Sequence, residues 1–473
     1  MNEINNSIFR EYDIRGIVET ELQDDVVERI ASAFAAVFVR ENKKKVAVAM
    51  DGRPSSDHIK DIVVRNLSKY GLHVVDIGLA PTPLMYYAVF KMNLGGGLVI
   101  TASHNPSEYN GFKALVGKEA QSGSQVKEIY KIAAAGDFPA EKPGSVEKKD
   151  IIPDYLDYVT KDIKLDKKIK VVVDGGNGTG GITGVPLYKQ LGAEVVDIFC
   201  DVDGTFPNHH PDPTRIENLT HLVAKVKETG ADLGIGFDGD GDRIGVVDKD
   251  GNILWGDQMT IIFARDILSK NPGAKIISEV KASEVLYADI EKQGGIPIMW
   301  KTGHSLIKKK IFEENALLAG EMSGHIFFND RWFGFDDAVY AGARLLEILS
   351  KTDQTLGGIM AGLPKVFNTP EIRVDTIEEV KFKIVSHIVE HFKKDYEVID
   401  IDGARVKFPF GWALVRASNT QPSLVVRFEA DTQAHLEEIK NIVEPVIAAT
   451  KKKFEGTASP ANKPLRGSAP KAG

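Results

Sequence analysis

The sequence predicts an α/β protein built from three tandem repeats of a similar mixed α/β-sheet domain, followed by a C-terminal α+β domain. Three observations predict this fold. The chain has 473 residues, which is enough for three or four domains. A strand–turn–helix–strand pattern occurs three times along it. The last segment departs from that pattern and has the helix, strand meander and helix of an α+β domain.

Each repeat opens with a continuous apolar run that ends in an acidic residue. Because these runs are apolar on both faces, each is expected to form a buried strand of a parallel sheet. A helix-length stretch and a second apolar strand follow, which together make a βαβ unit. The three openings are residues 44–56, 169–181 and 274–284, with the acids Asp51, Asp174 and Glu279.

Each repeat continues with another apolar strand that runs into a polar, glycine-containing loop. These segments are residues 95–113, 231–245 and 316–328. In open α/β sheets, ligands bind beyond the carboxyl ends of the strands, which is where these loops are expected. The three loops are therefore the predicted site.

The last segment begins with a strand-like stretch at 370–375 and a helical pattern over 376–395. Four short strands and a helix over about 432–452 follow. The C-terminal tail lacks an apolar period and is expected to be disordered. The predicted domains are residues 1–149, 150–252, 253–366 and 367–455, with the tail at 456–473.

Composition excludes several classes of protein. The net charge of −8 argues against nucleic acid as a partner. One cysteine, Cys200, excludes a disulfide framework and a cysteine-based zinc site. No apolar run approaches the ~18 residues of a membrane span, and the N-terminus has no signal-peptide core. A cytoplasmic protein without a membrane partner is expected.

The second loop, GFDGDGDRIG, predicts a metal site. Asp238, Asp240 and Asp242 alternate with glycines, so a tight turn can bring the three carboxylates to one hard cation. Ligation by a few oxygens suits Mg²⁺. An EF-hand does not fit, because Arg243 and Lys249 stand where that loop needs Gly and Glu.

The first loop, TASHNPSEYNGFK, places Ser103 after a strand. A serine hydroxyl is a poor nucleophile unless another group activates it. His104 is its neighbour, but adjacent residues are not expected to form a Ser–His dyad, and the G-x-S-x-G elbow is absent. The loop could be only a hydroxyl-bonded turn that stops at Pro106. A phosphorylated Ser103 facing a Mg²⁺ loop would explain it better.

Two further loops suit a sugar phosphate. GEMSGH offers Glu321, Ser323 and His325, which could pair with sugar hydroxyls, although a capped helix start would look similar. RASNTQP combines a guanidinium with hydroxyls and loop amides, a set that binds phosphate. An ordinary hairpin loop is the alternative there. Its residues are Arg416, Ser418, Asn419 and Thr420.

Two other patterns compete with this interpretation. GNGTGG (176–181), with Asp201 beyond it, has the form of a dinucleotide fingerprint, so an NAD-dependent oxidoreductase is an alternative. The equivalent turns of the other repeats lack the fingerprint, which favours glycines needed only for packing. His209 and His210 could bind a transition metal, but a structural role in a proline-rich loop is favoured.

Seven motifs together resemble one family. They are FREYDIRG (9–16), TASHNP (101–106), DGDGDR (238–243), KTGHS (301–305), GEMSGH (320–325), RWFGFDD (331–337) and RASNTQP (416–422). The chain is similar to the α-D-phosphohexomutase family, and most closely to its bacterial phosphomannomutase/phosphoglucomutase branch. The resemblance runs from Phe9 to about Lys452. The sequence GEMSGH differs from the GEQSGH that is typical of phosphoglucosamine mutases, which remain an alternative.

The resemblance implies a phosphoserine at Ser103 that donates a phosphoryl group to the sugar and later recovers one. Asp238, Asp240 and Asp242 would hold Mg²⁺ together with an oxygen of Ser103 or its phosphate. The implied reaction interconverts hexose 1-phosphate and hexose 6-phosphate, of mannose and glucose. Its intermediate and activator is a hexose 1,6-bisphosphate, which turns end for end while the fourth domain moves. The resemblance therefore also implies that the four domains are arranged around a central cleft.

The resemblance also implies which residues bind the substrate. Glu321 and Ser323 would bind the sugar 3- and 4-hydroxyls, with Lys281 and His304 beside them. Arg416, Ser418, Asn419 and Thr420 would bind the phosphate that is not transferred. Other matching positions are Tyr12, Arg15, Lys113, Arg243 and His325. Acid–base or charge-stabilising work is expected of Arg15, Lys113, His304 and His325, and the identity of the general base stays open.

The expected partners are small sugar phosphates. A monomer is the favoured state and a dimer is the alternative. A third candidate function, beside the mutase and the oxidoreductase, is a sugar-phosphate sensor that binds without catalysis.

Overall fold

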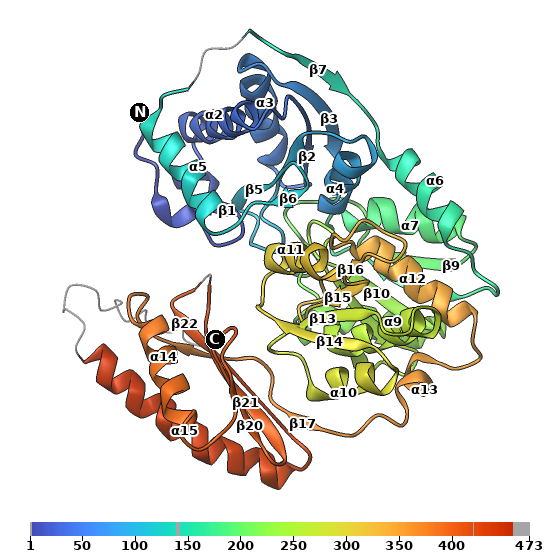
Figure 1. Cartoon of the computed structure of the whole chain (residues 1–473). Helices are drawn as coiled ribbons and strands as arrows, with labels where there is room; N and C mark the ends of the chain where they lie inside the picture. The colour runs from blue at the N-terminus through green and yellow to red at the C-terminus, as the bar shows by residue number, and fades with distance from the viewer. Residues whose placement is uncertain (1, 139–141, 420, 457–473) are drawn as a thin grey trace, which may run out of the picture. The chain divides into compact units, whose positions relative to one another are not determined.

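The computed structural model describes residues 2–138, 142–419 and 421–456 (Figure 1). Its chain divides into two compact units, one of residues 1–299 with 303–361 and one of residues 300–302 with 362 onward. Within the described residues, no helix combines the length and the apolar character that a membrane crossing needs. The predicted tail at 456–473 lies outside the described residues except for its first position.

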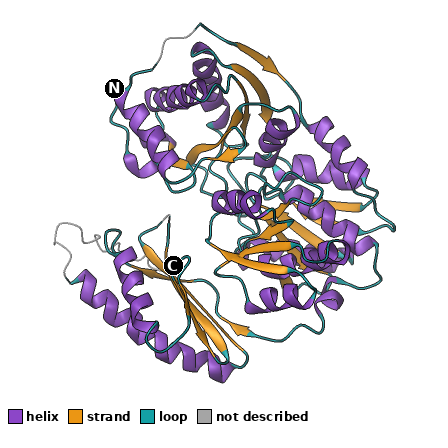
Figure 2. Ribbon diagram, viewed as in Figure 1, coloured by secondary structure: helices purple, strands orange, loops and turns teal. Residues whose placement is uncertain are grey.

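The first unit contains three sheets, whose strands are flanked by helices (Figure 2). The first sheet has the order β1-β5-β4-β2-β3-β7, with β6 on β5. Its strands are β1 (Ile14–Ile17), β2 (Lys45–Met50), β3 (His73–Leu79), β4 (Gly96–Ile100), β5 (Tyr109–Val116), β6 (Glu119–Ala120) and β7 (Ser145–Lys148). Its helices are α1 (Val18–Glu21), α2 (Asp24–Arg40), α3 (Ser56–Lys69), α4 (Thr82–Lys91) and α5 (Ser124–Ala135).

The second and third sheets have the orders β12-β11-β10-β8-β9 and β14-β13-β15-β16. Their strands are β8 (Lys170–Asp174), β9 (Glu194–Ile198), β10 (Leu233–Phe237), β11 (Ile244–Asp248), β12 (Ile253–Leu254), β13 (Lys275–Glu279), β14 (Ile296–Trp300), β15 (Leu318–Gly320) and β16 (Ile326–Phe328). The helices are α6 (Ile152–Asp162), α7 (Gly180–Gln190), α8 (Thr220–Thr229), α9 (Gly256–Lys270), α10 (Glu284–Lys292), α11 (His304–Glu314), α12 (Ala338–Ser350) and α13 (Leu356–Met360).

The three sheets share one four-strand arrangement, so the predicted repeat is confirmed. The equivalent orders are β3-β2-β4-β5, β9-β8-β10-β11 and β14-β13-β15-β16. In each, the second and third strands are parallel and the fourth is antiparallel. The runs apolar on both faces became the central strands β2, β8 and β13, as expected for strands covered on both sides. The predicted boundary at 252/253 falls between β11 and β12.

The core of the first sheet shows why the helices form where they do. In α2, Val27, Ile30, Phe34 and Phe38 recur at helical spacing and are at most 3% exposed. They belong to the same buried cluster as Val48 of β2. Burial of this stripe holds the helix on the sheet and leaves the strand ends free to carry loops.

The second unit is the predicted helix–meander–helix domain. Its sheet has the order β17-β22-β21-β20-β19, with β18 on β22. The apolar stripes of its two long helices pack on alternate residues of the central strands. The elements are β17 (Phe367–Asn368), β18 (Ile372–Asp375), α14 (Lys381–Phe392), β19 (Val398–Ile399), β20 (Ala404–Phe408), β21 (Gly411–Ala417), β22 (Ser423–Ala430) and α15 (Gln433–Glu455).

Candidate active site

Three loops from three sheets meet in the first unit, each following the third strand of its repeat. They follow β4, β10 and β15, which are the carboxyl ends that the sequence indicated. Glycines let their backbones touch: a Cβ on Gly239 would lie closer than 3.0 Å to the Ser103 carbonyl oxygen, and one on Gly324 would meet the Ile244 carbonyl in the same way. The loops are therefore packed backbone against backbone.

Ser103 is buried and faces the second loop. Its backbone has a left-handed φ of 53°, and its N–H donates to Thr101 Oγ1 at 2.8 Å. Its hydroxyl donates to Asp238 Oδ2 at 2.9 Å. Two features expected of this loop are therefore present together: a turn closed by a hydroxyl group, and a serine that faces the carboxylates of the second loop.

His104 contacts Ser103 without forming a Ser–His dyad. Its Nδ1 lies 3.0 Å from Ser103 Oγ, but the single hydroxyl proton of Ser103 is donated to Asp238, so the histidine does not act as its acceptor. The left-handed conformation at Ser103 turns the hydroxyl back toward the next side chain. Burial, and then the charge of Arg243, lowers the pKa of His104 well below its usual value, so this ring is neutral near pH 7.

Arg53 holds the serine loop and was missed in the sequence. The side chain is 3% exposed, and its Nε donates to Asp51 Oδ2 at 3.0 Å, at the end of β2. The other guanidinium nitrogens donate to four backbone carbonyls of the loop at 2.6–3.0 Å, those of Ser103, Asn105, Pro106 and Tyr109. Backbone acceptors leave no mark in a sequence, which is why no motif indicated this contact.

The change Arg53→Met should lower the melting temperature by about 5 °C or more, because it removes the buried cation paired with Asp51 and the hydrogen bonds from that cation to four carbonyls. Differential scanning calorimetry measures this shift. Arg65→Met is the matched control: Arg65 pairs with Glu28 at 3.0 Å, but the side chains are 63% and 48% exposed, so a shift below about 1 °C is expected. Equal shifts in both variants would contradict the holding role of Arg53.

The three aspartates of the second loop form a buried carboxylate cluster. One oxygen each of Asp238, Asp240 and Asp242 lies within 4.8 Å of the others, and all three side chains are 0% exposed. Lys113 of β5 donates to Asp240 at 2.6 Å and to Asp242 at 2.5 Å. Asp240 Oδ1 and Asp242 Oδ1 accept no hydrogen bond from any described residue. Two orphaned oxygens in an all-oxygen set fit a hard divalent cation.

The electrostatics of this cluster are uneven. Burial, and then the charges of Asp240 and Asp242, raises the pKa of Asp238 well above its usual range. Burial and Asp242 also raise the pKa of Asp240, but the Lys113 ammonium outweighs them and leaves that pKa lowered. Asp242 likewise has a lowered pKa, because Lys113 and then His325 overcome the effect of burial. A single lysine therefore cannot neutralise the whole cluster, and a cation would complete it.

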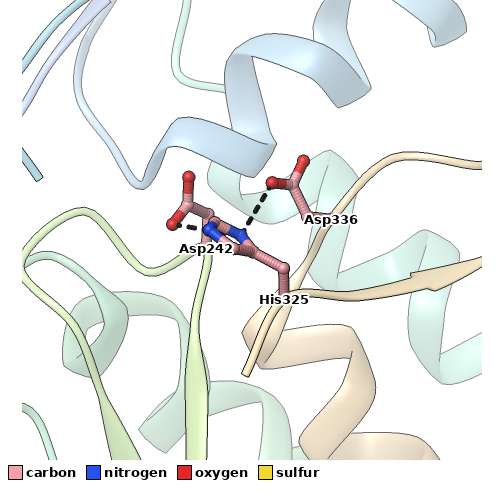
Figure 3. A group of neighbouring side chains, drawn as sticks. All are labelled: Asp242, His325 and Asp336. Carbon is pink, nitrogen blue, oxygen red and sulfur yellow. Dashed lines mark ion pairs between the residues drawn. The ribbon is translucent and has the colours of Figure 1, made fainter. Parts of the chain in front are cut away.

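His325 lies between Asp242 and Asp336 (Figure 3). Its Nδ1 is 2.9 Å from Asp336 Oδ2 and 3.6 Å from Asp242 Oδ1, while Arg243 Nε donates to its Nε2 at 2.9 Å. Because Nε2 accepts a proton donor, Nδ1 carries the proton and cannot bind a metal. With its proton on Nδ1, the ring has no free nitrogen to offer a cation between the two carboxylates, so this triad is not assigned as a second metal site. Asp336 belongs to RWFGFDD, one of the seven motifs that carry the family resemblance.

His304 begins α11 and stacks on His325, with ring centres 5.2 Å apart. Tyr12 meets His304 edge to face at 5.9 Å, and a Cβ on Gly303 would clash with the Tyr12 ring. Arg15 donates to the Asn105 side chain at 2.7 Å and to the Ala102 carbonyl at 3.2 Å. The structure thus places the predicted Tyr12 and His304 beside His325, and the predicted Arg15 on the serine loop.

The third loop is a tight turn between β15 and β16, so the alternative of a capped helix start is wrong. Glu321 is 2% exposed and accepts from the Gly303 N–H at 2.7 Å. Burial raises the pKa of Glu321. Ser323 is partly exposed at the tip of the turn, and Lys281 lies 3.7 Å from Glu279 after β13.

The fourth loop lies in the second unit, between β21 and β22. Arg416 at the end of β21 is 5% exposed and donates through Nε to Asp402 Oδ2 at 3.1 Å. Ser418 Oγ accepts from the Gln421 N–H at 3.2 Å, and Asn419 follows it in a bend. The predicted Thr420 lies outside the described residues.

The dinucleotide look-alike is explained by packing, as expected. A Cβ on Gly178 would meet the Gly239 backbone, one on Gly180 the Phe237 ring, and one on Gly181 Cys200, each at less than 3.0 Å. His209 Nε2 donates to the Asp174 carboxylate at 3.0 Å, and the ring stacks on His221. Among the described residues, no cluster of metal ligands includes His209 or His210.

Comparisons with known proteins agree with the site. Four models of phosphoglucomutase/phosphomannomutase domains match the chain: alpha/beta/alpha domain I at 6–140, II at 153–251, III at 255–367, and the C-terminal domain at 371–445. The chain is 47% identical to a phosphomannomutase/phosphoglucomutase of Pseudomonas putida, over 92% of this chain and 94% of that protein.

Two other relatives extend this finding. A phosphoglucomutase of Neisseria gonorrhoeae is 46% identical, over 94% of this chain and 98% of its own length. The crystal structure of a Burkholderia thailandensis phosphoglucomutase/phosphomannomutase family protein has 42% identity and a TM-score of 0.90, covering 97% of this chain and 99% of that one. The chain belongs to the phosphoglucomutase/phosphomannomutase family.

Proposed function

We propose that this chain is a phosphomannomutase/phosphoglucomutase, an isomerase that interconverts hexose 1-phosphate and hexose 6-phosphate of mannose and glucose. One observation carries the proposal. The Ser103 hydroxyl, from the first sheet, reaches the carboxylate cluster of the second sheet at 2.9 Å. A serine held against an all-oxygen cation site suits a phosphoserine that gives and recovers a phosphoryl group.

The cation in this proposal is Mg²⁺. Asp238, Asp240 and Asp242 would hold it together with an oxygen of Ser103 or its phosphate. When bound, it supplies positive charge that polarises the phosphoryl oxygens during transfer. The two oxygens without hydrogen bonds, on Asp240 and Asp242, support this assignment.

The chain's own residues would handle the remaining charge and protons. In the first transfer, the Ser103 O–P bond breaks, a new O–P bond forms to a free sugar hydroxyl, and that hydroxyl proton passes to the protein. Lys113, Arg15 and Arg243 supply fixed positive charge around the transferred group. His325 Nε2 already accepts from Arg243, so that nitrogen takes the proton only if the arginine moves toward the phosphate.

Sugar recognition is assigned to the third loop and its neighbours. Glu321 and Ser323 would bind adjacent sugar hydroxyls, with Lys281 beside them. The raised pKa of Glu321 reflects a carboxylate that lacks the solvation a polyhydroxylated ligand would restore. A hexose 1,6-bisphosphate is the proposed intermediate and activator.

The fourth loop is proposed to bind the phosphate that is not transferred, through Arg416, Ser418, Asn419 and Thr420. Arg416 Nε donates to Asp402 at 3.1 Å, and this hydrogen bond fixes the orientation of the guanidinium group. The change Arg416→Gln should raise KM for glucose 1-phosphate by about tenfold or more and lower kcat less. Steady-state kinetics measures both. Lys407→Gln, on the neighbouring strand and 38% exposed, is the control that should leave KM unchanged. An unaltered KM in Arg416→Gln would count against this role.

A coupled assay with mannose 1-phosphate and glucose 1-phosphate tests the function, together with the intact mass of the same sample. The proposal expects conversion of both sugars, dependence on Mg²⁺, stimulation by glucose 1,6-bisphosphate, and the added mass of one phosphoryl group. Conversion of glucosamine 1-phosphate alone would indicate the alternative mutase. Binding of sugar phosphate without conversion would indicate a sensor, and binding of a nicotinamide nucleotide an oxidoreductase.

A further inference from the structure

Lys308 is a buried amine to which the proposed reaction assigns no role. It lies one turn after His304 on α11 and is 5% exposed. Its Nζ is 2.7 Å from Asp336 Oδ1, 3.1 Å from His304 Nδ1 and 3.3 Å from the Tyr86 hydroxyl. An ammonium has three N–H groups and no acceptor, so each of these contacts is a donation by Lys308. The three donors are thereby all used.

The contact with Lys308 decides where His304 carries its proton. Because Nδ1 accepts from the ammonium, its lone pair is occupied and the proton of a neutral ring must be on Nε2. The competing acceptor for an Nδ1 proton, Asp336 Oδ2, is 3.7 Å away, which is too far for a hydrogen bond. Burial, and then Lys308, also lowers the pKa of His304 well below its usual value.

The neighbouring His325 has the opposite arrangement. Its Nδ1 carries the proton and points to Asp336 Oδ2, while Arg243 donates to its Nε2. Asp336 thus accepts from Lys308 through one oxygen, while its other oxygen lies 2.9 Å from His325 Nδ1. The two rings are stacked at 5.2 Å, with 21° between their planes. No described residue forms a hydrogen bond with Nε2 of His304, which leaves that N–H available to a ligand.

We propose that Lys308 is a positioning residue that fixes His304 as a neutral imidazole with its proton on Nε2, so that the ring meets a substrate oxygen as a hydrogen-bond donor and not as a base. This inference rests on the proposed function for what the donor is used for. The arrangement of protons itself does not depend on that function, because Lys308, Asp336 and Tyr86 are all residues of this chain.

The proton position can be read by NMR in the full-length protein labelled with ¹⁵N at histidine. Long-range ¹H–¹⁵N correlations at pH 7 distinguish a protonated from an unprotonated ring nitrogen, and the variant His304→Gln identifies the signals of His304. The expected spectrum shows a protonated Nε2 and an unprotonated Nδ1. A proton on Nδ1, or on both nitrogens, would overturn the proposal without any variant of Lys308 having to fold.

The variant Lys308→Met removes the donor and keeps the length of the side chain. Both tautomers of His304 should then be populated, and kcat should fall by about tenfold or more while KM changes less than about threefold. Lys309→Met is the matched control on the same helix: its ammonium is 3.8 Å from Glu119 and its side chain is 59% exposed. That variant should leave the His304 spectrum and kcat unchanged.

A Lys308→Met protein with the wild-type His304 spectrum, or with kcat within twofold of wild type, would refute the positioning role. If the wild-type protein converts no hexose phosphate, the proposed mutase function fails, while the spectrum still decides the proton position. The two failures are therefore distinguishable.

Discussion

Replacing Ser103 by alanine should lower the turnover of mannose 1-phosphate and glucose 1-phosphate by at least about 1000-fold, because it removes the hydroxyl that is proposed to carry the phosphoryl group beside Asp238. The change removes the only atom to which the transferred phosphoryl group would be bound between its two sugar positions. Intact mass should show that the variant no longer acquires a phosphoryl group after incubation with the 1,6-bisphosphate.

Binding should survive this substitution. The methyl group of Ser103→Ala leaves the loop contacts of Arg53 in place, since these go to the backbone carbonyl and not to the hydroxyl. Isothermal titration with glucose 1-phosphate is expected to give a dissociation constant within about threefold of wild type. Ser107→Ala, four residues along the same loop, is the control and should retain full activity. Full activity in Ser103→Ala would end the phosphoserine hypothesis.

The change Asp240→Asn should abolish the stabilisation that Mg²⁺ gives to the wild-type protein and lower turnover by about 100-fold or more. A cation that binds only the folded state stabilises it by about 2.7 kcal/mol at a concentration 100 times its dissociation constant. Thermal unfolding with and without millimolar Mg²⁺ measures this effect, independently of activity.

The stability of Asp240→Asn without metal separates a cation site from a merely structural cluster. The asparagine oxygen can still accept from Thr82 and Lys113, and one of three mutually repelling carboxylates is lost. The metal-free melting temperature should therefore stay within a few degrees of wild type. Asp250→Asn, in the exposed turn after β11, should keep the Mg²⁺ effect. If Asp240→Asn responds to Mg²⁺ as the wild type does, the cation is not bound at this cluster.

Much of the fold could be predicted because its signals are local in the sequence. The runs ending at Asp51, Asp174 and Glu279 are apolar on both faces, and each became a central strand with a βα turn at its carboxyl end. The alternation of Asp and Gly over 238–242 likewise predicts a turn that gathers carboxylates, and the three oxygens do meet. The sequence pattern and the geometry of the three carboxylates agree because both depend on one short segment of the chain.

The parts that could not be predicted depend on contacts between distant segments. Arg53 binds carbonyl groups some 50 residues away, and a carbonyl is present at every position of a chain. Asp336 matters because the fold brings it to His325 and Lys308, from a motif that shows only two adjacent acids. The contact between His104 and Ser103 occurs where the backbone at Ser103 is left-handed, a conformation that a non-glycine residue rarely adopts.

The close contact at Gly239 has a consequence for how this chain can vary. On one side its peptide touches the serine loop, and on the other it is met by Gly178 of GNGTGG, with no room for a methyl group at either glycine. A saturation-mutagenesis map should therefore show Gly178 and Gly239 to be as intolerant as the aspartates that are proposed to bind Mg²⁺, although neither offers a side chain to any ligand. Selection for a thin interface between two loops can in this way preserve the letters of a nucleotide-binding signature for reasons of packing alone.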